Sequence, residues 1–77
     1  MFSYVYNHHE RQLASRVNQL QYDHHDVIIT AQHVHLDHDN CMETVILKGK
    51  IAEVEECVNA ISSQTGVTHA KVHIIPR

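Results

Sequence analysis

The chain has 77 residues, 43% of them hydrophobic, and a formal net charge of −3 with neutral histidines. A length of this order holds one small domain, which buries only about 60% of the surface of its unfolded chain. Lysine and arginine total only six, and they are scattered. That distribution argues against a phosphate-binding surface, so this domain alone is not expected to hold DNA.

Cysteine content and hydropathy indicate the compartment. Cys41 and Cys57 are too few for a disulfide framework, and nothing before them has the pattern of a secretory signal. The apolar runs fall far short of the roughly 20 residues that span a membrane. We therefore expect a soluble, cytoplasmic protein without a membrane partner.

The first two predicted elements are a strand and a helix. Residues 2–6 are aromatic and β-branched, which is typical of a strand. Apolar residues then recur with helical spacing between residues 11 and 22, so a helix is predicted there. Asn7 is the expected cap of this helix, with Glu10 three positions later giving a loose capping box.

The rest of the chain predicts a hairpin, a helix and a last strand. A long strand over residues 27–36, turn residues 37–40 and a strand over 41–48 predict a hairpin with a four-residue loop. A second helix is predicted over residues 51–63, with Gly66 placed to end it in a left-handed conformation. The last strand is predicted over residues 67–75.

This order of elements is β-α-β-β-α-β, the split ferredoxin-like arrangement. It predicts one α+β domain over residues 1–77, with a four-stranded antiparallel sheet and both helices on one face. The second strand alternates so that Ile28, Val34 and Leu36 share one face and Val27, Ile29 and Ala31 share the other. A strand that is apolar on both faces is expected to be buried on both. A partner subunit is therefore expected to cover the open face of the sheet.

Histidine is the extreme feature of the composition, with nine in 77 residues. Such a density indicates metal or pH chemistry. His33 and His35 point to the same face of the second strand, with Cα atoms roughly 6.5–7 Å apart, and the turn returns Cys41 beside them. Two imidazoles and a thiolate suit Ni²⁺, Cu²⁺ or Zn²⁺, of which zinc prefers a tetrahedral site. The alternative is a strand that happens to carry histidines.

The segment from His33 to Glu43, HVHLDHDNCME, resembles the ligand hairpin of the nickel-responsive repressors. SYVY at residues 3–6 and QTGVTH at residues 64–69 extend this resemblance along the whole chain. It implies a ferredoxin-like (ACT-like) regulatory domain that assembles as a homotetramer, a dimer of dimers, with nickel between subunits. It also implies a square-planar site of two histidines and one cysteine from one subunit and one histidine from a facing subunit. By position, the first three are His33, His35 and Cys41.

The chain departs from the family pattern at the fourth ligand. The family has a histidine directly after the glutamine that ends the first helix, whereas here Tyr22 follows Gln21. A neutral phenol, with a pKa near 10, is a poor nickel ligand at neutral pH. His24 of a facing subunit, Tyr22 itself or water is left to complete the site.

The chain also lacks the ribbon-helix-helix segment with which the family begins. DNA binding is therefore expected only through a domain that this sequence does not contain. The chain is interpreted either as part of a longer regulator or as a stand-alone relative.

Other polar residues have weaker interpretations. Gln21 and Glu43 flank the predicted ligands and are candidates for orienting them, or for ordinary interface hydrogen bonds. A second, weaker metal site at the start of the first helix is the less favoured interpretation of His8 and His9. His38 is expected to be a solvated loop residue.

The predicted function is that of a metal-sensing, tetramerising regulatory domain of a nickel-responsive transcription regulator. Nickel is the expected ion, with copper and zinc as alternatives. The alternative function is a stand-alone metal-binding or buffering protein of the same family, without DNA binding. No general base is suitably placed in the sequence, so the chain is not expected to be an enzyme.

Overall fold

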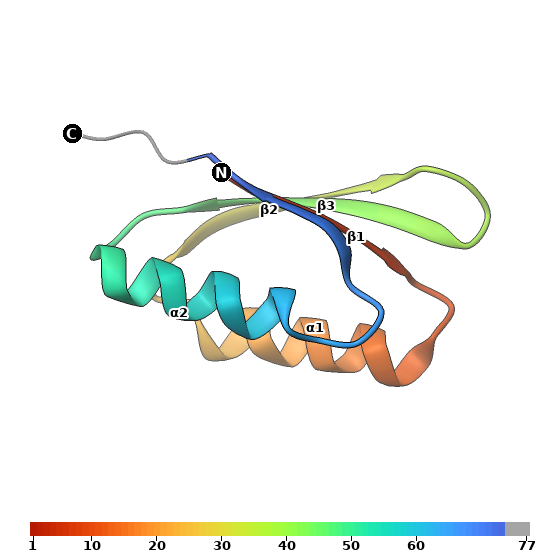
Figure 1. Ribbon diagram of the computed structural model, residues 1–77, viewed down its shortest axis with the longest axis horizontal. Coiled ribbons are helices and arrows are strands. Elements are labelled where there is room, and N and C mark those ends of the chain that lie inside the picture. The colour runs from red at the N-terminus through yellow and green to blue at the C-terminus, as the bar shows by residue number, and fades with distance from the viewer. Residues whose placement is uncertain (74–77) are drawn as a thin grey trace.

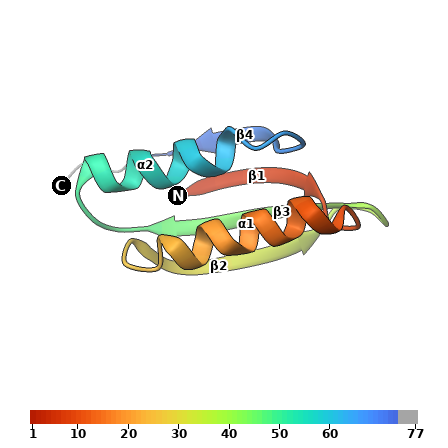
Figure 2. The ribbon, with the colours of Figure 1, turned by 90° about the horizontal axis from the view of Figure 1, so that it is seen from below.

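The computed structural model describes residues 1–73 and places two helices against one face of a single sheet (Figures 1 and 2). In chain order the elements are β1 (Phe2–Asn7), α1 (Arg11–Asp23), β2 (Ile28–His35), β3 (Asn40–Leu47), α2 (Ile51–Ser62) and β4 (Thr68–Val72). The sheet order is β2-β3-β1-β4, with antiparallel pairing throughout. This confirms the predicted ferredoxin-like fold. Neither helix of the described residues is long and apolar enough to cross a membrane.

The hydrophobic core lies between the helices and the inner face of the sheet. Alternate side chains of β1 and β3 point inward, because successive residues of a strand face opposite sides. The two helices supply residues at helical spacing. The buried apolar residues of these four elements are Phe2, Tyr4, Tyr6, Leu13, Val17, Cys41, Val45, Cys57 and Ile61.

The start of β2 departs from the predicted alternation. The β2–β3 ladder shifts register between Ile28 and Thr30, so Ile29 is an extra residue on the β2 side. Such a bulge reverses which residues face inward. Ile28 consequently packs against the core, whereas Val34 lies on the outer face. The prediction that Ile28 and Val34 share one face was therefore wrong.

The turn between β1 and α1 also differs from prediction. Glu10, and not Asn7, occupies the N-cap position of α1, and no side chain caps that helix. The side-chain oxygen of Asn7 instead accepts a hydrogen bond from the backbone N–H of His9 at 2.9 Å. Asn7 therefore stabilises the turn that precedes the helix.

The remaining boundaries are close to prediction. The hairpin loop has the expected length but comprises residues 36–39, one position earlier than predicted. The expected end of the last strand, residues 74–75, lies outside the described residues. Gly66 has a φ of +100°, which confirms its left-handed conformation, although it lies in the turn after α2 and not at the helix end itself.

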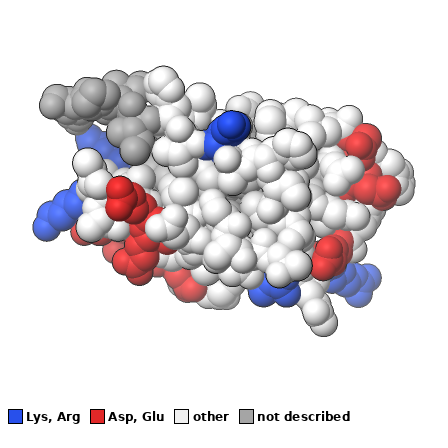
Figure 3. Space-filling model, in the orientation of Figure 1, with Lys and Arg blue, Asp and Glu red and all other residues white. Residues whose placement is uncertain are grey.

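The outer face of the sheet carries apolar side chains that no described residue covers. Val34 is 38% exposed and Ile46 47% exposed, and both point away from the helices. Figure 1 shows no second layer on that side of the sheet. In the view of Figure 3, the lysine and arginine side chains are separated and form no continuous basic surface.

Gly66 offers a test of the turn after α2. A Cβ at this position would lie 2.8 Å from Cδ2 of Leu13, which is fully buried and cannot easily move. Gly66→Ala adds this overlap to backbone strain at positive φ, so we expect the free energy of unfolding to fall by about 1–3 kcal/mol. Urea denaturation followed by circular dichroism measures the change. Thr65→Ala, at the exposed neighbouring position, is the control and should unfold like the wild type; equal midpoints for all three proteins would contradict this account.

Candidate metal centre

The predicted metal ligands lie at the hairpin end of the sheet, on its inner face. His33 is paired with Glu43, and His35 with Cys41, across the β2–β3 ladder. Directly opposed residues of antiparallel strands have Cβ atoms about 4.5–5.5 Å apart. Tyr6 of β1 is paired with Cys41 on its other side. The hairpin thus brings His33, His35 and Cys41 onto one face.

The donor atoms of these three residues do not converge on one point. Nδ1 of His33 lies 2.6 Å from a carboxylate oxygen of Glu43, and its Nε2 lies 3.0 Å from the hydroxyl of Tyr6. Cys41 is fully buried and is paired with Tyr6 in the β1–β3 ladder. The ring of His35 is not part of this hydrogen-bond network. A shared face is therefore present, but each donor has other neighbours.

Glu43 is a buried carboxylate, 1% exposed, at the centre of this network. One of its oxygens accepts hydrogen bonds from the hydroxyl of Tyr4 and the side-chain amide of Gln21. That amide also lies 2.7 Å from the Tyr4 hydroxyl. The other carboxylate oxygen faces His33. Burying a charge is costly unless hydrogen bonds satisfy it, and these donors meet that requirement.

The same network holds the His33 ring in one orientation. A carboxylate at Nδ1 fixes a proton on that nitrogen, so Nε2 is left to accept a hydrogen bond from Tyr6. Of the two interpretations offered for Glu43 and Gln21, the contact with His33 fits a ligand-orienting role for Glu43, and Gln21 is hydrogen-bonded to Glu43. Tyr4 and Tyr6 were not identified from the sequence, because their contacts depend on β1 lying beside β3.

Burial favours the protonated forms of the two phenols and the thiol at this site. Desolvation, together with the nearby Glu43, raises the pKa of Tyr4 and of Tyr6 well above the usual value, so both are neutral phenols at neutral pH. Desolvation also raises the pKa of the Cys41 thiol, against an opposing hydrogen bond with Tyr6. A metal that binds Cys41 must therefore displace its proton.

The two candidates for the fourth ligand lie at the end of α1, away from the hairpin loop. Tyr22 is 73% exposed near the end of α1, and His24 follows that helix, with its Nδ1 2.8 Å from the carbonyl oxygen of Leu20. The helix begins near the hairpin loop and runs back beneath the sheet (Figure 2). At 1.5 Å per residue, that run amounts to about 15 Å or more. Both residues therefore lie away from the hairpin loop, although the side chain of the neighbouring Gln21 reaches Glu43.

The fold and this set of donors together define a small, ferredoxin-like metal-binding domain. Residues 1–75 match the family model described as the NikR C-terminal nickel-binding domain. The chain therefore belongs to this family of nickel-binding regulatory domains, which is not a class of enzymes.

Curated relatives support the same membership. A predicted nickel-responsive regulator of Nitratidesulfovibrio vulgaris is 47% identical over 70 residues, which cover 91% of this chain and 50% of that protein. Another, of Syntrophus aciditrophicus, is 43% identical over 72 residues, covering 94% of this chain and 53% of that protein. The chain thus spans about half the length of these relatives.

Solved structures share the fold at low sequence identity. An uncharacterized protein of Thermotoga maritima superposes with a TM-score of 0.80 at 14% identity, covering 91% of this chain and 86% of that one. The C-terminal domain of the MgtC protein of Mycobacterium tuberculosis gives a TM-score of 0.65 at 14% identity, covering 91% and 79%. These likenesses concern the architecture alone.

Proposed function

We propose that this chain is the metal-sensing, subunit-associating domain of a nickel-responsive transcription regulator. In this proposal His33, His35 and Cys41 of each chain bind one divalent ion at this centre, nickel in preference to copper or zinc. The observation that carries it is the placement of these three residues on one face of the hairpin, in a chain that belongs to a nickel-binding family. Two imidazoles and a thiolate are suitable donors for such an ion.

The contact between His33 and Glu43 supports this assignment. Histidines that bind metals usually donate their other ring N–H to a carboxylate, which fixes the tautomer and makes the ligand more basic. With Nδ1 directed at Glu43, Nε2 is the donor that His33 offers to a metal. The Tyr6 hydroxyl, which now faces Nε2, would have to give way.

We propose that the domain assembles as a homotetramer, a dimer of dimers. The apolar outer face of the sheet, with Val34 and Ile46 exposed, offers one surface for association. A second contact would form at the metal, because Tyr22 is 73% exposed at the end of α1 and is therefore available to a facing subunit. A facing subunit would supply the fourth ligand, so that metal binding and assembly favour each other.

The regulator is favoured over a stand-alone metal buffer because the similar proteins carry a regulator's name and are about twice as long as this chain. In such a regulator the metal needs only to favour one arrangement of the attached domains over another. DNA binding would belong to a further domain.

Cys41→Ser tests the metal centre. The serine hydroxyl keeps the size of the side chain but cannot form the thiolate that gives nickel or copper its sulfur charge-transfer absorption. We expect that absorption to disappear and nickel affinity to fall at least about tenfold, which is about 1.4 kcal/mol. Absorption spectra and calorimetric titration measure both effects. Cys57→Ser, at the other buried cysteine, is the matched control and should keep the absorption; an unchanged spectrum in Cys41→Ser would remove the hairpin from the site.

Ile46→Lys tests association through the outer face. Light scattering of the wild type should give a mass several times the 8.9 kDa of one chain. A lysine in place of Ile46 would place a charge in the proposed interface, so we expect dissociation into smaller species. Ile51→Lys, on the exposed start of α2, is the control and should leave the mass unchanged. A stable wild-type monomer at micromolar concentration, with or without nickel, would contradict the proposed assembly.

Tyr22→His tests the fourth ligand. An imidazole at this exposed position would restore a third nitrogen donor across the subunit boundary, so we expect nickel affinity to rise at least about tenfold, or about 1.4 kcal/mol. The nickel spectrum should also shift toward the square-planar, thiolate-bound type. If His24 already supplies the fourth nitrogen, Tyr22→His has little effect and His24→Ala weakens binding. Titration of both variants separates the two ligands, and no effect from either would leave water in the fourth position.

A further inference from the structure

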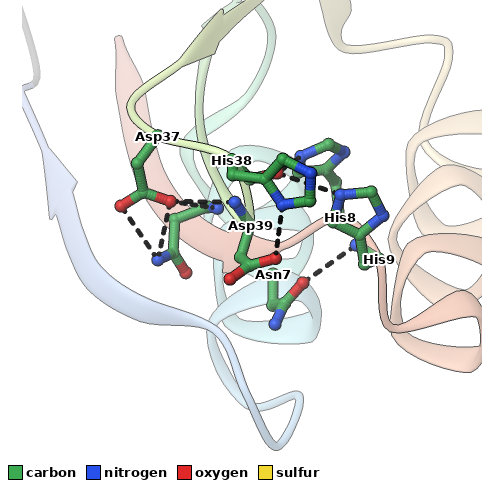
Figure 4. Close-up of polar contacts among 7 residues, drawn as sticks. Asn7, His8, His9, Asp37, His38 and Asp39 are labelled. Carbon is green, nitrogen blue, oxygen red and sulfur yellow. Dashed lines mark hydrogen bonds and ion pairs between the residues drawn. The ribbon is translucent and has the colours of Figure 1, made fainter.

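A group of histidines from two separate segments meets at the tip of the hairpin. His8 and His9 belong to the turn between β1 and α1, and His38 and Asp39 belong to the hairpin loop (Figure 4). Nε2 of His8 lies 3.1 Å, and Nε2 of His9 2.9 Å, from the carbonyl oxygen of His38. The rings of His9 and His38 are stacked with centroids 5.0 Å apart. The two segments are thus held together by contacts that only the fold creates.

The donor atoms of this group are close enough to share an ion. One ligand atom from each of His9, His38 and Asp39 lies within 4.8 Å of the others, a combination found nowhere else among residues 1–73. Nδ1 of His38 is already 3.1 Å from a carboxylate oxygen of Asp39. Donors bound to one ion at 2.0–2.2 Å are themselves roughly 3 Å apart. The third donor needs only a small side-chain rotation.

The side chains are free to make that rotation. Those of His38 and Asp39 are 88% and 60% exposed, and His9 is exposed as well. The backbone beneath them is well held: Asp37 accepts hydrogen bonds from the backbone N–H groups of Asp39 and Asn40 at 2.9 and 2.8 Å. These bonds also keep the pKa of the Asp37 carboxyl below its usual value. A hydrogen-bonded backbone with exposed donors suits a site that closes around an ion.

We propose that His9, His38 and Asp39 form a second site for a divalent transition ion, separate from the hairpin donors. Two imidazoles and one carboxylate suit nickel or zinc, with water in the remaining positions. This donor set contains no thiolate, and it shares no residue with His33, His35 and Cys41. Because it is exposed and carries fewer protein donors, it should bind more weakly than the first site.

The tip site, formed by His9, His38 and Asp39 at the tip of the hairpin, lies next to the hairpin donors, so an ion there would affect the hairpin. His8 lies between the two sites: its ring is 4.3 Å from that of His9 and edge-on to that of His35 at 4.9 Å, measured between centroids. An ion at the tip would link the β1–α1 turn to the loop of the hairpin that carries His35 and Cys41. The link would restrict movement of that hairpin.

Nickel titration of the folded chain, with binding measured by calorimetry and the thiolate absorption recorded in parallel, tests the proposal. The wild type should bind two ions per chain, the second more weakly. The double variant His9→Gln/His38→Gln should lose the weaker ion, or bind it at least tenfold less tightly, while the thiolate absorption stays unchanged. Asp39→Asn should weaken the same ion. The control is His25→Gln/His73→Gln, which removes two exposed histidines outside the tip and should keep both ions.

The two proposals fail separately in this experiment. Suppose that the protein never shows thiolate absorption but binds an ion that the tip variant loses. That result would support the tip site and count against the hairpin site. A wild type that binds one ion, or a tip variant that binds the second ion as tightly as the wild type, would overturn the tip site.

Discussion

A buried carboxylate, that of Glu43, connects the core of this domain to its candidate metal centre. The carboxylate sits among aromatic side chains, where it is stable only because Tyr4 and Gln21 donate hydrogen bonds to it and His33 faces it. Because a buried carboxylate without hydrogen bonds is unfavourable, Glu43 holds its hydrogen-bonding partners in place. The orientation of the His33 ring depends on this packing, and so does any metal chemistry at that ring.

The sheet order determines how accessible each candidate donor is. β2 is an edge strand, so His33 and His35 remain exposed, while Cys41 on the neighbouring β3 is covered by Tyr6. The hairpin thus combines two accessible imidazoles with a buried thiol. Burial raises the pKa of this thiol, so the thiol keeps its proton. An edge strand also leaves backbone groups and apolar side chains available to another chain. The proposed histidine ligands and the exposed apolar residue Val34 thus lie on opposite faces of the same edge strand.

The direction of α1 sets where the proposed fourth ligand lies relative to the hairpin loop. The helix leaves the hairpin end and runs back under the sheet, which carries Tyr22 and His24 to the opposite end. These side chains therefore lie near the start of β2 and away from the hairpin loop. In the proposed assembly, a facing subunit would supply the fourth ligand from the end of its own α1. Tyr22 stands where the family pattern has a histidine. The strength of the proposed contact between the metal and a facing subunit is therefore specific to this chain.

Much of the fold and of the candidate metal centre could be predicted from residues that are close together in the sequence. The alternation of side chains along a strand placed His33 and His35 on one face, and a short turn returned Cys41 beside them. The element order predicted the fold. Each of these inferences needs only residues near one another in the chain.

Other features depended on the tertiary structure. The bulge at Ile29 reversed the facing of Ile28, because pairing with β3 sets the register there. Tyr4 and Tyr6 reached Glu43 and His33 only because β1 lies beside β3. The meeting of His9 with His38, 29 positions later, likewise required the folded sheet to bring a turn and a loop together. Local periodicity carries no information on which distant segments become neighbours, so these contacts were decided by packing.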